Sequence, residues 1–149
     1  MNRMPNPKDE LSGGCLCGAV QFAIKAPFRP VIQCHCGQCA RWTGHYVAAT
    51  QVATEQFKLI NGSDHLAWYR SSNRAERGFC SKCGSSMFWR RPDDGRISIL
   101  AGTLERPTGL KTSHHIFVAV KSDYYDVRDT TPCYDRWMEK TDTAKGEAD

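Results

Sequence analysis

The chain has 149 residues, of which 40% are hydrophobic and 24% charged, and it carries a formal net charge of +4. This composition is ordinary for one soluble globular domain, and so mild a charge argues against a nucleic-acid-binding protein. No apolar run approaches the ~20 residues that cross a bilayer, and residues 1–10 are too polar for a secretory signal. We therefore expect a cytoplasmic protein with no membrane association.

Short segments in which apolar and polar residues alternate run through the chain, separated by proline, glycine and asparagine turns. This pattern predicts an all-β fold. We expect strands at 19–25, 31–33, 46–51, 55–60, 66–70, 75–79, 86–90, 96–101 and 116–120. Only 138–145 has a weak helical pattern. The expected organisation is a flexible lead-in at 1–11, one β domain at 12–137 and a charged tail at 138–149.

Cysteine is the most informative residue type. Seven of the eight cysteines form the first pair (Cys15, Cys17), the thiol trio (Cys34, Cys36, Cys39) and the last pair (Cys80, Cys83). Thiols one or two residues apart can chelate one zinc ion. The even count also allows four disulfides, but clustered spacing without a secretion signal favours metal. The eighth, Cys133, stands alone and is expected to be a free or buried thiol.

The number of clustered thiols predicts two zinc ions per chain. A closed tetrahedral site takes four ligands, so seven thiols make one closed structural site and one three-thiol site with an open position. Gly18 and Gly84 follow the first and last pairs, where a positive φ would turn backbone amides toward sulfur. This favours joining the two pairs. Spacing alone leaves a second division open, in which Cys36 and Cys39 join the last pair and Cys34 joins the first.

Three blocks of sequence resemble a known family. They are Gly14-Cys-Leu-Cys-Gly-Ala-Val-Gln-Phe22, Cys34-His-Cys-Gly-Gln-Cys-Ala-Arg-Trp-Thr-Gly44 and Arg77-Gly-Phe-Cys-Ser-Lys-Cys-Gly-Ser-Ser-Met-Phe-Trp89. In this order, within residues 12–126, the chain resembles the glutathione-dependent formaldehyde-activating enzyme family, which includes the centromere protein V-like proteins. Any one block would be a weak signal, whereas the three together are highly specific.

The resemblance implies a zinc-stapled β-tent of short antiparallel strands. It assigns two ligand sets: Cys15, Cys17, Cys80 and Cys83 to a structural zinc, and Cys34, Cys36 and Cys39 to the active site. It also implies a carbon–sulfur lyase-type enzyme that condenses glutathione with formaldehyde to S-hydroxymethylglutathione, so a thiol and an aldehyde are the expected partners. The chain departs from the family at Gly37, Ala40 and His45. These departures surround the trio and concern the substrate rather than the fold.

An open three-thiolate zinc site suits this chemistry, because the ion can lower the pKa of an incoming thiol or polarise an aldehyde oxygen. Three thiolates make zinc a poorer Lewis acid, so we favour capture of the thiol. The candidate catalytic residues are Cys34, His35, Cys36 and Cys39, with acid–base work or hydrogen bonding as the alternatives for His35.

Further candidates lie outside the trio. His45 is a candidate fourth ligand or proton carrier, one of His114 and His115 is a candidate for approach to the site, and His65 is expected in a loop. Four positive side chains are either carboxylate-binding groups or solvated surface charges: Arg41, Arg70, Arg77 and Lys121. Trp42 is a candidate pocket wall.

Two other functions fit the same residues. The chain is alternatively a non-catalytic zinc scaffold that binds a protein partner, although a scaffold needs only the closed site. A thiol redox protein that uses Cys36 and Cys39 is disfavoured, because the βαβ context of a thioredoxin-like motif is absent. The leading hypothesis is a zinc enzyme that acts on a thiol–aldehyde adduct.

Overall fold

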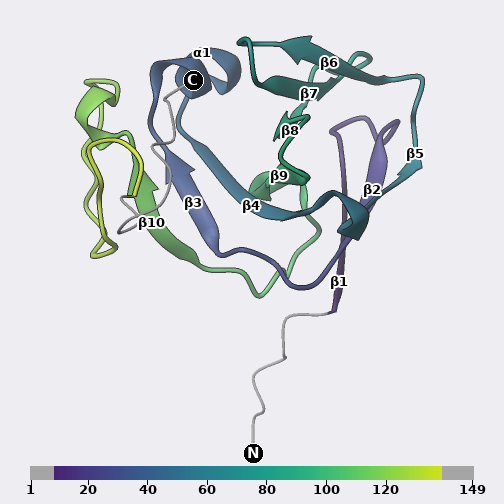
Figure 1. Ribbon diagram of the computed structural model, residues 1–149, viewed down its shortest axis with the longest axis horizontal. Helices are drawn as coiled ribbons and strands as arrows, with labels where there is room; N and C mark the ends of the chain where they lie inside the picture. Colours follow the sequence, from purple (N-terminus) through teal and green to yellow (C-terminus); the bar gives the residue numbers. More distant parts are fainter. Residues whose placement is uncertain (1–8, 139–149) are drawn as a thin grey trace, which may run out of the picture.

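The structure, a computed structural model, describes residues 9–138 of the chain (Figure 1). Its strands and one α-helix are β1 (Glu10–Gly14), β2 (Gln21–Lys25), β3 (Val31–Cys34), α1 (Gly37–Thr43), β4 (Val47–Ala53), β5 (Phe57–Asn61), β6 (Leu66–Arg70), β7 (Glu76–Cys80), β8 (Ser86–Arg91), β9 (Arg96–Leu100) and β10 (Thr112–Ile116). Short 3-10 turns lie at Thr54–Gln56, Ala101–Thr103 and Val118–Val120. The all-β prediction is confirmed.

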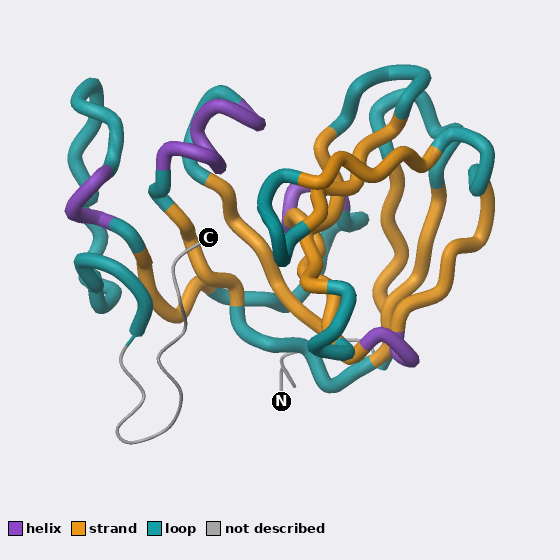
Figure 2. The backbone as a smooth tube through the Cα atoms, turned by 45° about the horizontal axis from the view of Figure 1, so that its top comes forward, coloured by secondary structure: helices purple, strands orange, loops and turns teal. Residues whose placement is uncertain are grey.

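The strands form two sheets. One has the order β1-β2-β5, and the other has the order β10-β3-β4-β9-β8-β7-β6. Neighbouring strands run antiparallel, except that β10 runs parallel to β3. Figure 1 and Figure 2 both place the three-stranded sheet and β10 at opposite sides of the molecule. Strands β7 and β8 therefore lie nearer the small sheet than β3 and β10 do.

The main core fills the space between the two sheets. Phe22 of β2 has its ring centre 5.0 Å from that of Phe88 in β8, in an edge-to-face arrangement. Phe57 of β5 lies 5.1 Å from the same Phe88 ring. Aliphatic side chains from both sheets complete this buried cluster: Leu11, Val20, Ile24, Val52, Met87, Ile97, Ile99 and Leu104. Removal of this apolar surface from water holds the sheets together.

Strand β1 belongs to this core, so the domain starts earlier than the expected boundary at residue 12. Leu11 is only 3% exposed. A Cβ atom at Gly13 would lie 2.5 Å from a ring carbon of Phe22, so only glycine lets β1 pack this closely. The expected boundary falls inside β1.

Two further elements differ from the sequence-based expectations. The last strand is β10, not 116–120, because Phe117 takes a left-handed conformation with φ 58° and a 3-10 turn follows it. Helix α1 was expected as a loop; Cys36 caps its start, and Gly44 ends it with φ 83°. The weak helix at 138–145 lies, after its first residue, outside the described residues. No helix within 9–138 is long and apolar enough to span a bilayer.

Candidate metal centres and active site

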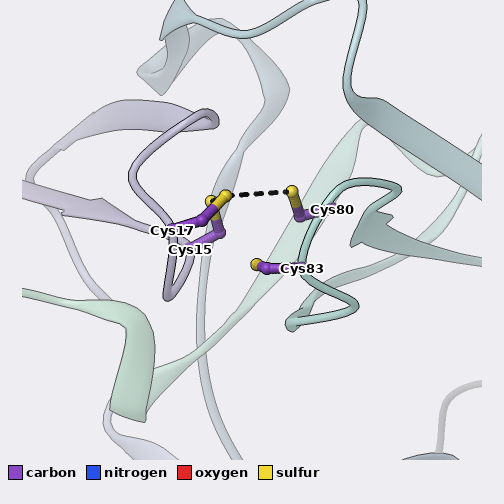
Figure 3. Close-up of side chains that lie close together, drawn as sticks. All are labelled: Cys15, Cys17, Cys80 and Cys83. Atoms are coloured by element: carbon purple, nitrogen blue, oxygen red, sulfur yellow. Dashed lines mark hydrogen bonds between the residues drawn. The ribbon is translucent and has the colours of Figure 1, made fainter.

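The first and last pairs come together in a four-thiol group (Cys15, Cys17, Cys80, Cys83), whose sulfur atoms all lie within 4.8 Å of one another (Figure 3). The Sγ atoms of Cys15 and Cys17 are 3.6 Å apart, and those of Cys17 and Cys80 are 3.9 Å apart. A tetrahedral zinc with Zn–S bonds of ~2.3 Å sets its sulfurs about 3.8 Å apart. The spacing of these sulfurs therefore fits zinc. The group also joins the β1–β2 connection of one sheet to the β7–β8 connection of the other.

Both pairs end in the glycine turn expected from the sequence. Gly18 and Gly84 each have φ 79°. The Gly18 amide donates to the Cys15 carbonyl at 3.2 Å, and the Gly84 amide donates to the Cys80 carbonyl at 2.7 Å. These turns fold each pair into a chelating loop, and the predicted positive φ is confirmed at both positions.

Hydrogen bonds to two sulfurs of the four-thiol group favour the thiolate form, which binds a cation. The Val20 amide donates to the Cys15 sulfur at 3.2 Å. Ser85 hydrogen-bonds the Cys83 sulfur at 3.2 Å, and its side-chain and backbone bonds lower the pKa of Cys83 to about 5. Cys83 is therefore a thiolate at neutral pH, the form that binds a metal. The Ser85 hydroxyl also accepts from the Leu16 amide at 2.9 Å, which ties the two loops together.

The thiol trio forms a second group, again with its sulfurs within 4.8 Å of one another. Cys34 is the last residue of β3, Cys36 caps α1, and Cys39 lies in the first turn of that helix. The Cys39 amide donates to the Cys36 sulfur at 3.4 Å. The structure thus groups the seven clustered sulfurs in the first of the two divisions that spacing allowed.

The trio stabilises one thiolate and disfavours the formation of a second. Hydrogen bonds from the Cys34 and Cys39 thiols lower the pKa of Cys36 to about 2. The bonds that Cys34 makes with Cys36 and Cys39 raise its own pKa above the ordinary value. A bound cation would remove this opposition, because it favours deprotonation of every sulfur that contacts it. Three soft sulfur donors in this charge state fit a thiophilic metal.

His35 lies between two trio residues and is buried, with 2% of its surface exposed. Its Nδ1 lies 2.6 Å from the Tyr125 hydroxyl, and its Nε2 lies 2.9 Å from Nδ1 of His115. The other ring nitrogen of His115 lies 2.8 Å from Oδ2 of Asp129. Burial is the main cause that lowers the pKa of His35 to about 4. The His35 ring is therefore neutral at pH 7.

The sequence analysis singled out His35 and His115 but not Tyr125 or Asp129. These two residues lie on the irregular segment after β10, which folds back along that strand. The His115 amide donates to the Pro132 carbonyl at 2.9 Å, and the Tyr134 amide donates to the His115 carbonyl at 3.0 Å. No periodic pattern marks such a segment in a sequence, so its approach to the trio loop could not be foreseen.

The remaining histidines lie apart from the metal-binding groups. His45 is exposed and hydrogen-bonds the Tyr124 hydroxyl at 2.6 Å, and its ring nitrogens are not part of the trio group. His114 is buried against the Tyr134 ring and bonds Ser113 at 2.8 Å. His65 lies in a turn, as expected.

The expected positive side chains divide by burial. Arg41 and Arg70 are exposed. The Nζ of Lys121 donates to the Tyr125 carbonyl at 2.7 Å. Arg77 is only 5% exposed, so its interpretation as a solvated surface charge is wrong. Its hydrogen bond to Ser71 and its contact with an indole ring offset part of the cost of burial.

A cavity of about 250 Å³ lies beside the trio. It is lined by Thr43, Tyr46, Val47, Ala48, Ser86, Leu100, Gly102 and Thr103. Two lining residues, Val47 and Leu100, form a buried cluster with Cys39, and Trp42 packs against that cluster. The cavity and the trio therefore share one apolar wall. Trp42 supports this wall and does not line the cavity itself.

Comparison with known proteins agrees with the arrangement of the thiols. The sequence profile described as glutathione-dependent formaldehyde-activating enzyme matches residues 10–120. A Halomonas elongata protein, provisionally named a glutathione-dependent formaldehyde-activating enzyme, is 26% identical over 138 residues, which cover 83% of this chain and 86% of that protein. An uncharacterized lyase of Schizosaccharomyces pombe is 29% identical over 80 residues, which cover 54% of this chain and 57% of the lyase.

A solved structure has the same fold. The crystal structure of a Rhodobacter sphaeroides protein superposes with a TM-score of 0.54 at 25% sequence identity, over 68% of this chain and 97% of that one. The profile match spans β1 to the turn after β10 and so includes both thiol groups. The chain belongs to the glutathione-dependent formaldehyde-activating enzyme family.

Proposed function

We propose that the chain catalyses the reversible addition of a thiol, with glutathione as the leading candidate, to formaldehyde. The observation that carries this proposal is the trio itself. Its three sulfurs converge from the end of β3 and the start of α1, and among residues 9–138 no histidine, carboxylate or fourth thiol joins them. A three-ligand metal site keeps a position for a substrate atom. A scaffold would need only the four-thiol group, so the trio favours an enzyme.

The proposal includes zinc at both groups, structural at the four-thiol group and catalytic at the trio. A zinc ion in the trio supplies positive charge that lowers the pKa of an incoming thiol. Cys34, Cys36 and Cys39 hold that charge at the end of β3 and the start of α1. Their partial burial and the apolar wall formed by Val47 and Leu100 keep water from this side of the site.

The neighbouring cavity supports a small second substrate. Its volume of about 250 Å³ lies below the ~300–1,000 Å³ of pockets for drug-sized ligands. A one-carbon aldehyde fits such a space, whereas most of a bulky thiol would remain outside it. In the reaction the thiol S–H bond breaks, a C–S bond forms and the proton passes to the aldehyde oxygen. Reversal is a carbon–sulfur lyase reaction, with no change in oxidation state.

Thiols and formaldehyde also combine without a catalyst, so the test must measure a rate. We propose magnetisation-transfer NMR with ¹³C-formaldehyde, which reports exchange between the hydrate and S-hydroxymethylglutathione at equilibrium. The wild-type protein should accelerate this exchange, and Cys36→Ser should lower the rate to that in buffer while it retains the fold. Cys133→Ser is the matched control, because Cys133 is an exposed thiol outside both groups. Equal rates with and without wild-type protein would refute the proposed function.

A further inference from the structure

Four side chains form one continuous hydrogen-bonded chain from the trio loop to the protein surface. The Tyr125 hydroxyl lies 2.6 Å from His35 Nδ1, His35 Nε2 lies 2.9 Å from His115 Nδ1, and His115 Nε2 lies 2.8 Å from Asp129 Oδ2. Both imidazole rings are 2% exposed, whereas the Asp129 side chain is 49% exposed. The two ends therefore differ: Tyr125 bonds the histidine that lies between Cys34 and Cys36, and Asp129 faces solvent.

The ionised carboxylate of Asp129 determines which atom donates in each hydrogen bond of the four side chains. Its carboxylate accepts from the amide and hydroxyl of Thr131, bonds that keep its pKa below the ordinary value. An ionised carboxylate only accepts, so His115 must carry its proton on Nε2. Where Nε2 carries the single ring proton of His115, its Nδ1 is an acceptor, and His35 then carries its proton on Nε2 as well. His35 Nδ1 in turn accepts from the Tyr125 hydroxyl.

Tyr125 therefore donates its proton to His35 and keeps oxygen lone pairs that can accept another. The residue is half-buried. Burial is the main cause that raises its pKa, followed by the effects of Tyr124 and Tyr46. Its bond to His35, the residue between Cys34 and Cys36, places the hydroxyl beside the trio loop. Its ring centre lies 5.9 Å from that of Tyr46, which lines the cavity. Lys121 holds the Tyr125 carbonyl from the other side at 2.7 Å.

We propose that Tyr125 is the proton-transfer residue of the trio site and that His35, His115 and Asp129 are positioning residues behind it. This inference rests on the proposed function. The incoming thiol gives its proton to the Tyr125 oxygen while the phenol proton moves to His35 Nδ1. The Nε2 proton of His35 moves to His115 Nδ1, and the Nε2 proton of His115 moves to Asp129.

The reverse movement returns one proton from Tyr125 to the aldehyde oxygen as the C–S bond forms. Each imidazole exchanges one N–H for another and stays neutral, and only the carboxylate changes charge. No oxidant or reductant takes part, because the thiol S–H bond is replaced by the O–H bond of the product. The four hydrogen-bonded side chains thus hold the proton between its release by the thiol and its delivery to the aldehyde oxygen.

The first test reads the direction of the hydrogen bonds without any substrate. In the zinc-loaded protein with ¹⁵N-labelled histidine, the ring-nitrogen shifts at pH 7 should place the proton of both His35 and His115 on Nε2. Asp129→Asn should reduce this preference, because an amide can donate as well as accept. A proton on Nδ1 of either ring in the wild-type protein, or two protons on one ring, would overturn the proposed direction.

The second test is kinetic and uses the same NMR exchange. Tyr125→Phe keeps the ring and loses the hydroxyl, so kcat should fall about 100-fold with little change in KM. Asp129→Asn should lower kcat less. Because Asp129 acts only through Tyr125, the double variant should be no slower than Tyr125→Phe alone. Tyr124→Phe is the matched control, since the Tyr124 hydroxyl bonds the exposed His45 ring and a backbone carbonyl, not a member of the hydrogen-bonded chain.

These results separate the two proposals. If wild-type protein accelerates the exchange and Tyr125→Phe is equally fast, the role of Tyr125 fails while the proposed function stands. Additive losses from Tyr125→Phe and Asp129→Asn would overturn the positioning role of Asp129. If wild-type protein does not accelerate the exchange, the proposed function and the transfer step fail together. Unchanged zinc content and amide spectra of each variant exclude unfolding as the cause of a loss.

Discussion

The guanidinium carbon of Arg77 lies 5.4 Å from the centre of the Trp42 ring, so a buried cation from β7 stacks on the helix that carries Cys39. Strand β7 also ends in Cys80 of the four-thiol group. The hydrogen bond with Cys34 lowers the pKa of Cys39, but Cys36 and burial together raise it to about 11, and the Arg77 charge acts against this rise. Arg77 therefore stabilises negative charge in the trio from a buried position.

Removal of this charge should weaken metal binding at the trio. We expect Arg77→Met to lower zinc affinity there by about 10- to 100-fold, the usual effect of losing a group that supports the ligands of a metal. Arg77→Lys keeps the charge and should retain most of the affinity. Chelator competition on the more weakly held of the two zinc ions measures the effect. Equal losses in Arg77→Met and Arg77→Lys would show that the planar stacking, not the charge, supports the site.

The four-thiol group should control stability. Cys17 and Cys80 are 63 residues apart in sequence, and a crosslink that closes a loop of this length contributes about 4 kcal/mol. We expect Cys83→Ser to lower the free energy of unfolding by roughly that amount. Urea unfolding monitored by tryptophan fluorescence measures it, with Cys133→Ser as the control. A Cys36→Ser protein that loses as much stability as Cys83→Ser would contradict the separation into a structural and an active group.

A substitution at Gly84, in the turn that follows the last pair, tests whether backbone geometry supports the four-thiol group. Gly84 has φ 79° and open space around its Cβ position, so Gly84→Ala imposes conformational strain without a clash. It should cost about 1–2 kcal/mol of stability. Gly37 also has open space but lies in α1, where alanine favours the helix. Gly37→Ala should therefore be neutral or stabilising in the same unfolding measurement. Equal destabilisation by both substitutions would rule out backbone strain at Gly84.

His114 should make the protein less stable in acid. Burial, with the charge of Arg29, lowers its pKa below the ordinary 6.5. As pH falls through 6.5 the unfolded chain takes up a proton at this position and the folded chain does not, so the free energy of unfolding decreases. An NMR titration of the ring should give a pKa below 6.5, and His114→Gln should lose less stability between pH 7 and 5.5 than wild type. A ring that titrates at or above 6.5 would contradict this.

Local patterns predicted most of the strands and the positive φ of Gly18 and Gly84, because alternation and glycine position act over a few residues. Helix α1 was missed since its seven residues are too short for a clear 3.6-residue period. The glycine at position 44, in a left-handed C-cap, was the available signal. The strand expected at 116–120 was wrong because Phe117 takes a left-handed conformation that no residue pattern marks.

The site likewise has some parts that the sequence could predict and others that it could not. The thiol groups could be foreseen, because each chelating unit is local and only the pairing of units was open. The contact between His35 and Tyr125 spans 90 residues and depends on how an irregular segment folds back along β10. The burial of Arg77 depends on the same kind of long-range packing. Such contacts arise from the tertiary fold and leave no periodic trace in the sequence.

The separation in sequence between the two pairs of the four-thiol group also sets the order in which the group can form during synthesis. A ribosome that adds ~5–20 residues per second needs about 3–13 s to make the 63 residues between Cys17 and Cys80. Throughout that interval the early thiols are exposed without their partners, open to oxidation and to ions that prefer two ligands. The two sheets can be joined only once the β7–β8 hairpin has left the exit tunnel. An oxidising environment would therefore damage the nascent chain most readily before Cys15 and Cys17 gain the partners that complete their group.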